Sequence, residues 1–176
     1  MKYKNATIIL ALVIIFGCLV LSAAYIRYVY NEPYNPIANS RAEISQALAE
    51  LKKDKLLIII LGANWCPQCR NLANDIVTAP LKNKIDASFS VVKVDVNGWD
   101  RNMAIVEMLD NPIKGGIPTI VVVNNDKKII LTSTGIDLAK ARKSAGSYFE
   151  YFSFIEEKYI KSDNLFATDN NKILDI

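Results

Sequence analysis

Two cysteines, Cys66 and Cys69, are separated by only Pro67 and Gln68. If a helix begins here, cysteines with this spacing face each other across its first turn and can form a disulfide. Unpaired N–H groups and the dipole at a helix N-terminus stabilise negative charge, and Pro67 suits the first helical position because its missing N–H is not needed there. The spacing therefore favours the thiolate of Cys66, the reactive form in thiol–disulfide exchange. Cys69, one turn further in, would be the more buried resolving thiol.

Two other interpretations of the pair have less support. A structural zinc site needs four ligands, but the chain has no histidine and its third cysteine, Cys18, lies in an apolar N-terminal segment. The lack of histidine also excludes Ser-His-Asp and Cys-His catalysis. A purely structural disulfide that closes so short a loop adds little stability. We therefore expect a redox-active pair that needs no metal and no organic cofactor.

The N-terminal segment contains 21 residues without a charge, Ala6–Ile26. As a helix it would span roughly 30 Å, the hydrocarbon thickness of a bilayer. We expect a signal-anchor helix, with three alternatives. A cleaved signal peptide would use the small residues Ser22–Ala24, although its apolar region usually has only about 7–15 residues. A lipoprotein would be acylated at Cys18, because Ile15–Cys18 resembles a lipobox with a bulky Phe16. The third alternative is a helix packed in a soluble core.

The net charge of +3 belongs entirely to this N-terminal segment, because Lys2, Lys4 and Arg27 are there without an acid and the rest of the chain is formally neutral. Two of the three positive side chains precede the apolar run. The positive-inside rule then places the N-terminus in the cytoplasm and the rest outside it. In a bacterium this is the periplasm, where disulfides persist. So small a net charge does not favour a nucleic-acid partner.

The elements that must position the pair alternate between strand and helix. Leu56–Leu61 is a continuous apolar run, typical of a strand buried on both faces. Ser40 and Glu43 form a capping box that would begin the first helix of the domain. The pattern predicts helices over 41–53, 67–78, 101–109 and 147–159, with strands over 89–96, 119–123 and 128–131. The last two strands would form a hairpin. This order predicts an α/β fold whose mixed central sheet has helices on both faces.

Two motifs in this framework resemble the thioredoxin superfamily. The stretch Gly62–Cys69, which reads GANWCPQC, is similar to the active-site region of that family, and Gly116–Thr119, about fifty residues later, resembles its cis-proline loop. The similarity covers roughly residues 40–160. It implies the thioredoxin fold, with Cys66 as the attacking cysteine, Cys69 as the resolving cysteine and Pro118 as the cis-proline.

The same resemblance implies substrate contacts around the pair. The backbone of Ile117 would pair with the bound substrate, and Trp65, Pro67 and Pro118 would flank it, although Trp65 could also be an ordinary core aromatic. One departure from the family is Ile60, which stands where cytosolic thioredoxins carry a buried Asp. The dipeptide between the cysteines is another, because it lacks the histidine of the periplasmic oxidases.

The sequence thus predicts a thiol–disulfide oxidoreductase anchored through residues 6–26, with its domain facing the periplasm or cell exterior. Its partners would be proteins with disulfides or thiols and a membrane or extracytoplasmic redox partner, and reduction is favoured over oxidation. The alternative is a redox-inactive binding or assembly module with a structural cysteine pair. The expected organisation is a transmembrane helix over 1–30, a linker over 31–39, a thioredoxin-like domain over 40–160 and a loose tail over 161–176.

Overall fold

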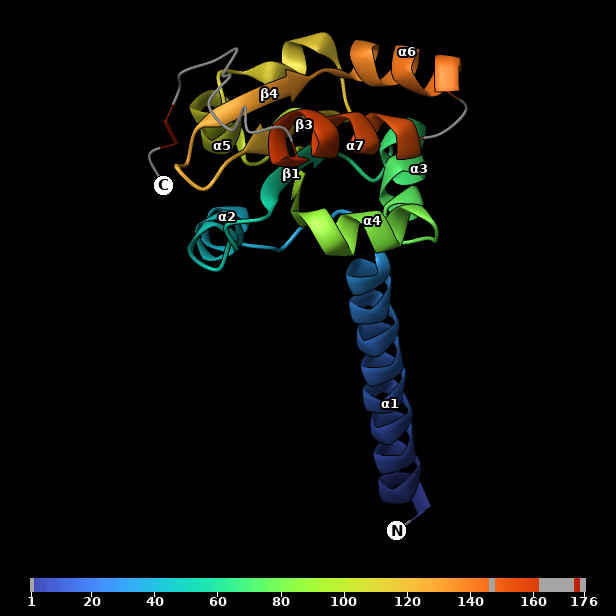
Figure 1. Cartoon of the computed structure of the whole chain (residues 1–176). Coiled ribbons are helices and arrows are strands. Elements are labelled where there is room, and N and C mark those ends of the chain that lie inside the picture. Colours follow the sequence, from blue (N-terminus) through green and yellow to red (C-terminus); the bar gives the residue numbers. More distant parts are fainter. Residues whose placement is uncertain (1, 146–147, 162–172, 175–176) are drawn as a thin grey trace.

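A computed structural model describes residues 2–145, 148–161 and 173–174. Helix α1, Lys2–Asn31, extends as a long rod away from a body of helices and strands (Figure 1). Its stretch Ile8–Arg27 has a mean hydropathy of 2.8 and is long and apolar enough to cross a membrane, and none of it is buried within the protein. This exposure excludes a helix packed in a soluble core. It leaves a membrane span or a signal sequence.

The sheet has four strands in the order β2-β1-β3-β4. Strand β1, Leu56–Gly62, is central and buried along its whole length, as its apolar run predicts. It pairs in parallel with β2, Phe89–Asp95, and antiparallel with β3, Thr119–Val123. Strand β4, Ile129–Ser133, completes an antiparallel hairpin with β3. The predicted mixed sheet is therefore confirmed, with its parallel pair in the β1–β2 half.

Helices cover both faces of this sheet, because successive residues of β1 point into two different cores. The core on one face contains residues of α3 (Pro67–Asp75), α4 (Leu81–Ser88) and α7 (Phe149–Glu156). The other contains residues of α2 (Ser40–Ala49) and α5 (Met103–Met108). Helix α6 (Gly135–Ala145) follows β4, and short helical turns cover Pro112–Gly115 and Glu157–Lys161. Both cysteines of the pair belong to the first core.

The structure corrects three details of the predicted helices. The expected helix over 67–78 ends at Asp75, and a separate helix, α4, follows Pro80. A residue before proline is disfavoured in the helical conformation, so two helices meet around this position. The first helix of the domain is capped by Asn39, whose side-chain oxygen accepts a hydrogen bond from the Ala42 N–H (3.2 Å), and not by the expected box at Ser40 and Glu43.

The C-terminal part of the chain differs from the expectation in two further ways. Helix α6 was not predicted, because its apolar pattern is sparse: Leu138 is buried but Ile136 is exposed. The expected loose tail lies mostly outside the described residues. Its residue Leu174 nevertheless is buried, and its N–H donates to the Lys127 carbonyl oxygen (2.8 Å). At least this part of the C-terminal segment packs on the domain.

Candidate functional site

The cysteine pair lies where the central strand passes into a helix. Strand β1 ends at Gly62, and Pro67 is the first residue of α3, as predicted. Cys66 is the N-cap of this helix, and its Sγ accepts a hydrogen bond from the Cys69 N–H (3.2 Å). The two cysteines form a disulfide with a Cα–Cα distance of 5.3 Å. The local fold therefore places a backbone N–H donor and the helix N-terminus at the Cys66 sulfur, where both favour negative charge.

The two sulfurs of the pair differ in access. Cys66 is 5% exposed, whereas Cys69 has no exposed surface. Of the two residues, only Cys66 has surface that an incoming sulfur could contact. This asymmetry fits an attacking and a resolving thiol.

A second loop faces Cys66 across the site. The Ile117–Pro118 peptide bond is cis, as the family resemblance implies, and Pro118 is buried. The Cys66 Sγ lies 3.8 Å from the Ile117 carbonyl oxygen. Gly116 precedes these residues with φ +88°, a backbone conformation that residues with a side chain rarely adopt. Its carbonyl oxygen accepts a hydrogen bond from the Thr119 hydroxyl (2.7 Å). The structure thus brings together Cys66, Cys69, Pro67, Ile117 and Pro118.

Two tryptophans form an exposed rim beside the pair. Trp65 is 56% exposed and Trp99 45% exposed, and their rings meet edge to face with centroids 6.3 Å apart. The Trp65 Nε1–H donates to the Asn97 carbonyl oxygen (2.7 Å). Trp65 is therefore not a core aromatic, and its ring pairs with that of Trp99, a contact that the sequence pattern does not indicate.

The loop that carries Trp99 is fixed by a buried carboxylate, Asp95, at the end of β2. Asp95 is 3% exposed, forms an ion pair with Arg101 and accepts a hydrogen bond from the Asn97 N–H (3.1 Å). Its backbone carbonyl oxygen accepts a further hydrogen bond from the Asn102 side chain (2.8 Å). These contacts tie the loop on both sides of Trp99 to the end of β2.

Ile60 occupies the family's carboxylate position. It lies in the middle of β1 with no exposed surface, in the same buried cluster as both cysteines. Strand β1 therefore supplies only apolar contacts at this position. The site therefore lacks, on β1, the buried carboxylate that cytosolic thioredoxins carry.

A polar group reaches the pair from the segment between α1 and α2, which the sequence predicts only as a linker. Tyr34 lies between α1 and α2 and has no exposed surface, and its hydroxyl donates to the Cys69 carbonyl oxygen (3.3 Å). Burial raises the pKa of Tyr34 well above its usual value, and the nearby Tyr148 and Asp95 add to the rise. The hydroxyl therefore stays protonated and acts as a donor. The one sequence signal for this contact was an aromatic residue flanked by prolines in an otherwise polar stretch.

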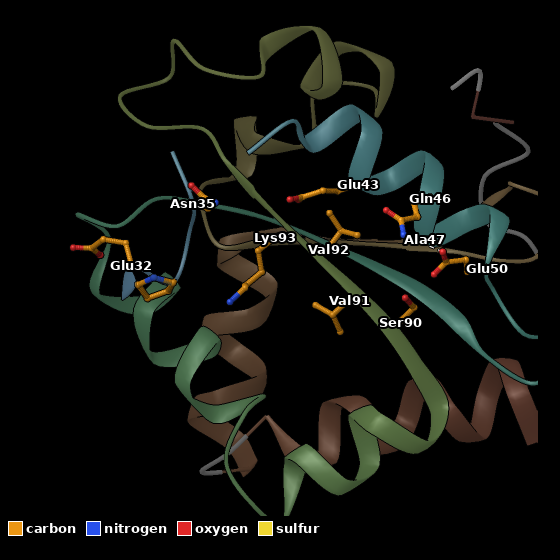
Figure 2. A pocket seen from close by; sticks show the side chains of 11 residues that line it. Glu32, Asn35, Glu43, Gln46, Ala47, Glu50, Ser90, Val91, Val92 and Lys93 are labelled. Atoms are coloured by element: carbon orange, nitrogen blue, oxygen red, sulfur yellow. Dashed lines mark hydrogen bonds between the residues drawn. The ribbon is translucent and has the colours of Figure 1, made fainter. Parts of the chain in front are cut away.

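Several cavities lie away from the pair, along β2. One of about 490 Å³ is lined by Glu32 and Asn35 after α1, by Glu43 of α2 and its C-cap Glu50, and by Lys93 of β2, among others (Figure 2). Partial burial lowers the pKa of Lys93. Two smaller cavities, of about 270 and 170 Å³, also border β2. Neither cysteine lines any of these three cavities.

Comparisons with known proteins agree with this geometry. A family model described as thioredoxin-like matches residues 39–125. A disulphide isomerase from Xylella fastidiosa Temecula1 is 37% identical, with a TM-score of 0.66, over 71% of this chain and 97% of that protein.

Two further solved structures are more distant. The germline-specific thioredoxin Deadhead of Drosophila melanogaster is 21% identical over 60% of this chain and 89% of its own, with a TM-score of 0.42. A DsbH oxidoreductase is 17% identical over 58% and 81%, with a TM-score of 0.41. No curated protein matches significantly. The family match, the extent of the similarity to the Xylella protein and the spacing of Cys66 and Cys69 together show that the chain belongs to the thioredoxin superfamily and is homologous to thiol–disulfide oxidoreductases.

Proposed function

We propose that this protein is a membrane-anchored thiol–disulfide oxidoreductase that acts on protein disulfides outside the cytoplasm. The observation that carries the proposal is the environment of Cys66. Its Sγ accepts the Cys69 N–H (3.2 Å) and lies 3.8 Å from the Ile117 carbonyl oxygen. A thiolate there is stabilised by a helix N-terminus and faces a backbone segment to which an extended substrate can bind.

The proposed reaction is a dithiol–disulfide exchange in two steps. The Cys66 thiolate attacks one sulfur of a substrate disulfide, the substrate S–S bond breaks, and the other substrate sulfur leaves as a thiolate. The Cys69 thiolate then attacks the Cys66 sulfur, which breaks the mixed disulfide and releases the second substrate thiolate. Two electrons have passed to the substrate, and Cys66–Cys69 is the disulfide seen in the structure. A partner dithiol restores the reduced pair by the reverse exchange.

Substrate binding would use the surface next to Cys66. The exposed Trp65 and Pro67 flank the sulfur on one side, and Ile117 and Pro118 on the other. Because Trp65 and Pro67 are exposed, this surface is open to a segment of a protein substrate.

Reduction of substrates is the proposed direction. A strongly stabilised thiolate makes a disulfide oxidising, and the Pro67–Gln68 dipeptide lacks the histidine that gives the periplasmic oxidases this stabilisation. The equilibrium constant of the Cys66–Cys69 pair with glutathione gives its reduction potential, which indicates the direction of the reaction. A potential near that of thioredoxin, about −270 mV, supports a reductase, and one near −120 mV would show an oxidase.

We further propose that residues 6–26 remain as a membrane anchor, with a linker over 31–39, a catalytic domain over 40–160 and a tail over 161–176. Support comes from the exposed apolar span of α1 and from Lys2 and Lys4 at its start. We expect the protein to resist extraction from membranes at alkaline pH and to retain its N-terminal residues in an intact-mass measurement. A shortened, extractable chain would show a cleaved signal peptide, and an acyl mass on a chain beginning at Cys18 would show a lipoprotein.

Replacing Cys69 with alanine should trap the first step of the reaction. The variant can form the mixed disulfide through Cys66 but has no resolving thiol, so we expect protein adducts on non-reducing gels of cell extracts that disappear with dithiothreitol. The double variant with Cys66→Ser is the matched control and should form none. The absence of adducts, together with a Cys66 thiol that titrates near the ordinary value of about 8.5, would contradict the proposal.

The lack of a carboxylate at Ile60 favours a second candidate function, a binding or assembly module in which the pair is structural. An insulin-reduction assay with dithiothreitol separates the two functions. Acceleration over the uncatalysed rate supports the oxidoreductase, and a rate equal to it supports the module.

A further inference from the structure

The segment that joins α1 to α2 packs beneath the redox helix. Its Tyr34 is fully buried and donates a hydrogen bond to the carbonyl oxygen of Cys69 (3.3 Å). We propose that Tyr34 is a positioning residue for the redox pair, through which the juxtamembrane segment sets the reactivity of Cys66. This inference rests on the proposed oxidoreductase function and deepens it.

Tyr34 is held in place by its own backbone as well as by its ring. Its N–H donates to the Asn64 Oδ1 (3.0 Å), and the Asn64 Nδ2 donates to the Tyr34 carbonyl oxygen (2.7 Å). Asn64 comes two residues before Cys66 along the chain. The segment therefore contacts the redox loop on both sides of the pair, at Asn64 before Cys66 and at the carbonyl of Cys69 after it.

The end of β1 is shaped to receive this ring. A Cβ atom at Gly62 would lie 2.5 Å from the Tyr34 hydroxyl oxygen and 2.6 Å from Cε1, distances at which atoms collide. The tyrosine thus fills the space that a side chain at Gly62 would occupy. Such close packing leaves the hydroxyl few positions other than the one at Cys69.

The hydroxyl acts on the turn that stabilises the Cys66 sulfur. Cys69 presents its N–H to Cys66 Sγ and its carbonyl oxygen to Tyr34. Fixing Cys69 from the carbonyl side restricts the rotation of the first turn and so keeps the Cys69 N–H directed at the Cys66 sulfur. Because Ile60 removes the family's carboxylate from β1, this neutral hydroxyl from the juxtamembrane segment is a polar side-chain contact of the pair that the family pattern does not predict.

The position of Tyr34 also brings the pair close to the anchor. Only Glu32 and Pro33 separate it from Asn31, the last residue of α1. Three residue steps span at most about 11 Å. The redox helix is therefore held near the domain end of α1, and the residue that holds it there is the one that touches Cys69.

The test replaces Tyr34 with phenylalanine in the full chain in detergent micelles. The ring still fills the space at Gly62, so only the hydrogen bond is lost. We expect a three- to tenfold increase in the equilibrium constant for forming the Cys66–Cys69 disulfide from the dithiol, where tenfold corresponds to 29.6 mV. We also expect Cys66 alkylation by iodoacetamide to require a higher pH, because the thiolate loses support. A role in packing alone would change neither quantity.

The matched control is Tyr159→Phe. Tyr159 is buried in the same cluster, and its hydroxyl has no hydrogen-bond partner within the described residues. This variant should keep the wild-type equilibrium and alkylation profile. If Tyr34→Phe has the wild-type equilibrium constant and alkylation profile, or if Tyr159→Phe shifts them equally, the inference is overturned. The proposed function still stands in either case, provided that the wild-type chain carries out thiol–disulfide exchange. A wild-type pair that neither equilibrates with glutathione nor reacts as a thiolate overturns both.

Discussion

Replacing Cys66 with serine is expected to reduce the rate of disulfide reduction on the order of 10³-fold or more, to the background rate. The attacking group in thiol–disulfide exchange is the thiolate, and a serine hydroxyl cannot form the mixed disulfide. Cys69 cannot replace it, because it has no exposed surface and lies one helical turn inside α3. Insulin reduction in the presence of dithiothreitol, followed by turbidity, measures the loss.

The third cysteine provides the matched control for this variant. Cys18 is exposed on α1, within the apolar span and away from the pair. Cys18→Ser should therefore reduce insulin at the wild-type rate. Substantial activity in Cys66→Ser would contradict the assignment of the attacking thiol, and a loss in Cys18→Ser would place the third cysteine in the reaction.

The parts of the site that could be predicted from the sequence depend on local signals. Proline in the first helical position and cysteines three residues apart determine the start of α3 with little help from the rest of the fold. The apolar run of β1 needs burial on both faces wherever it lies in the sheet. The hairpin of β3 and β4 has its own turn, in which the Asn124 side chain accepts hydrogen bonds from the Asp126 and Lys128 N–H groups (3.0 and 2.9 Å).

The parts that could not be predicted depend on contacts between distant segments. The prolines around Tyr34 mark an unusual aromatic residue, but they do not identify its contacts with Gly62 and with Cys69, which lies 35 positions away. Trp99 meets Trp65 through a loop that is tied down by the Asp95–Arg101 ion pair and by the Trp65 hydrogen bond to Asn97. Helix α4 was not predicted for a different reason. A proline is compatible both with the end of one helix and with the N-cap of the next, and Pro80 is the N-cap of α4.

At the N-terminus of α2, a local sequence signal predicted the wrong capping residue. Ser40 and Glu43 have the spacing of a capping box, but the neighbouring Asn39 is also a good cap and its side chain makes the hydrogen bond. Ser40 becomes the first residue of the helix, where its side chain is buried. The choice between adjacent caps was decided by packing, which the sequence pattern does not contain.

Replacing Gly62 with alanine is expected to destabilise the domain by about 1–3 kcal/mol, the usual cost of overpacking a core. Two effects oppose each other here. Alanine restricts the unfolded chain, which by itself would stabilise the protein by about 0.4–1 kcal/mol where the backbone conformation allows it. The new Cβ, however, would collide with ring atoms of Tyr34, which is buried against β1 and cannot move without losing its contacts with Cys69 and Asn64. The collision is the larger effect.

Urea unfolding of the full chain in micelles, followed by the fluorescence of Trp65 and Trp99, should show this as a midpoint lower by about 1 M. Gly98→Ala is the matched control, because a Cβ at Gly98 meets nothing within 4 Å. Alanine there should leave the free energy of unfolding unchanged or raise it slightly. Adding Tyr34→Leu to Gly62→Ala should cost less than the sum of the two single changes, since the smaller side chain leaves room for the Cβ. Strict additivity, or a stable Gly62→Ala protein, would show that Tyr34 does not occupy this space.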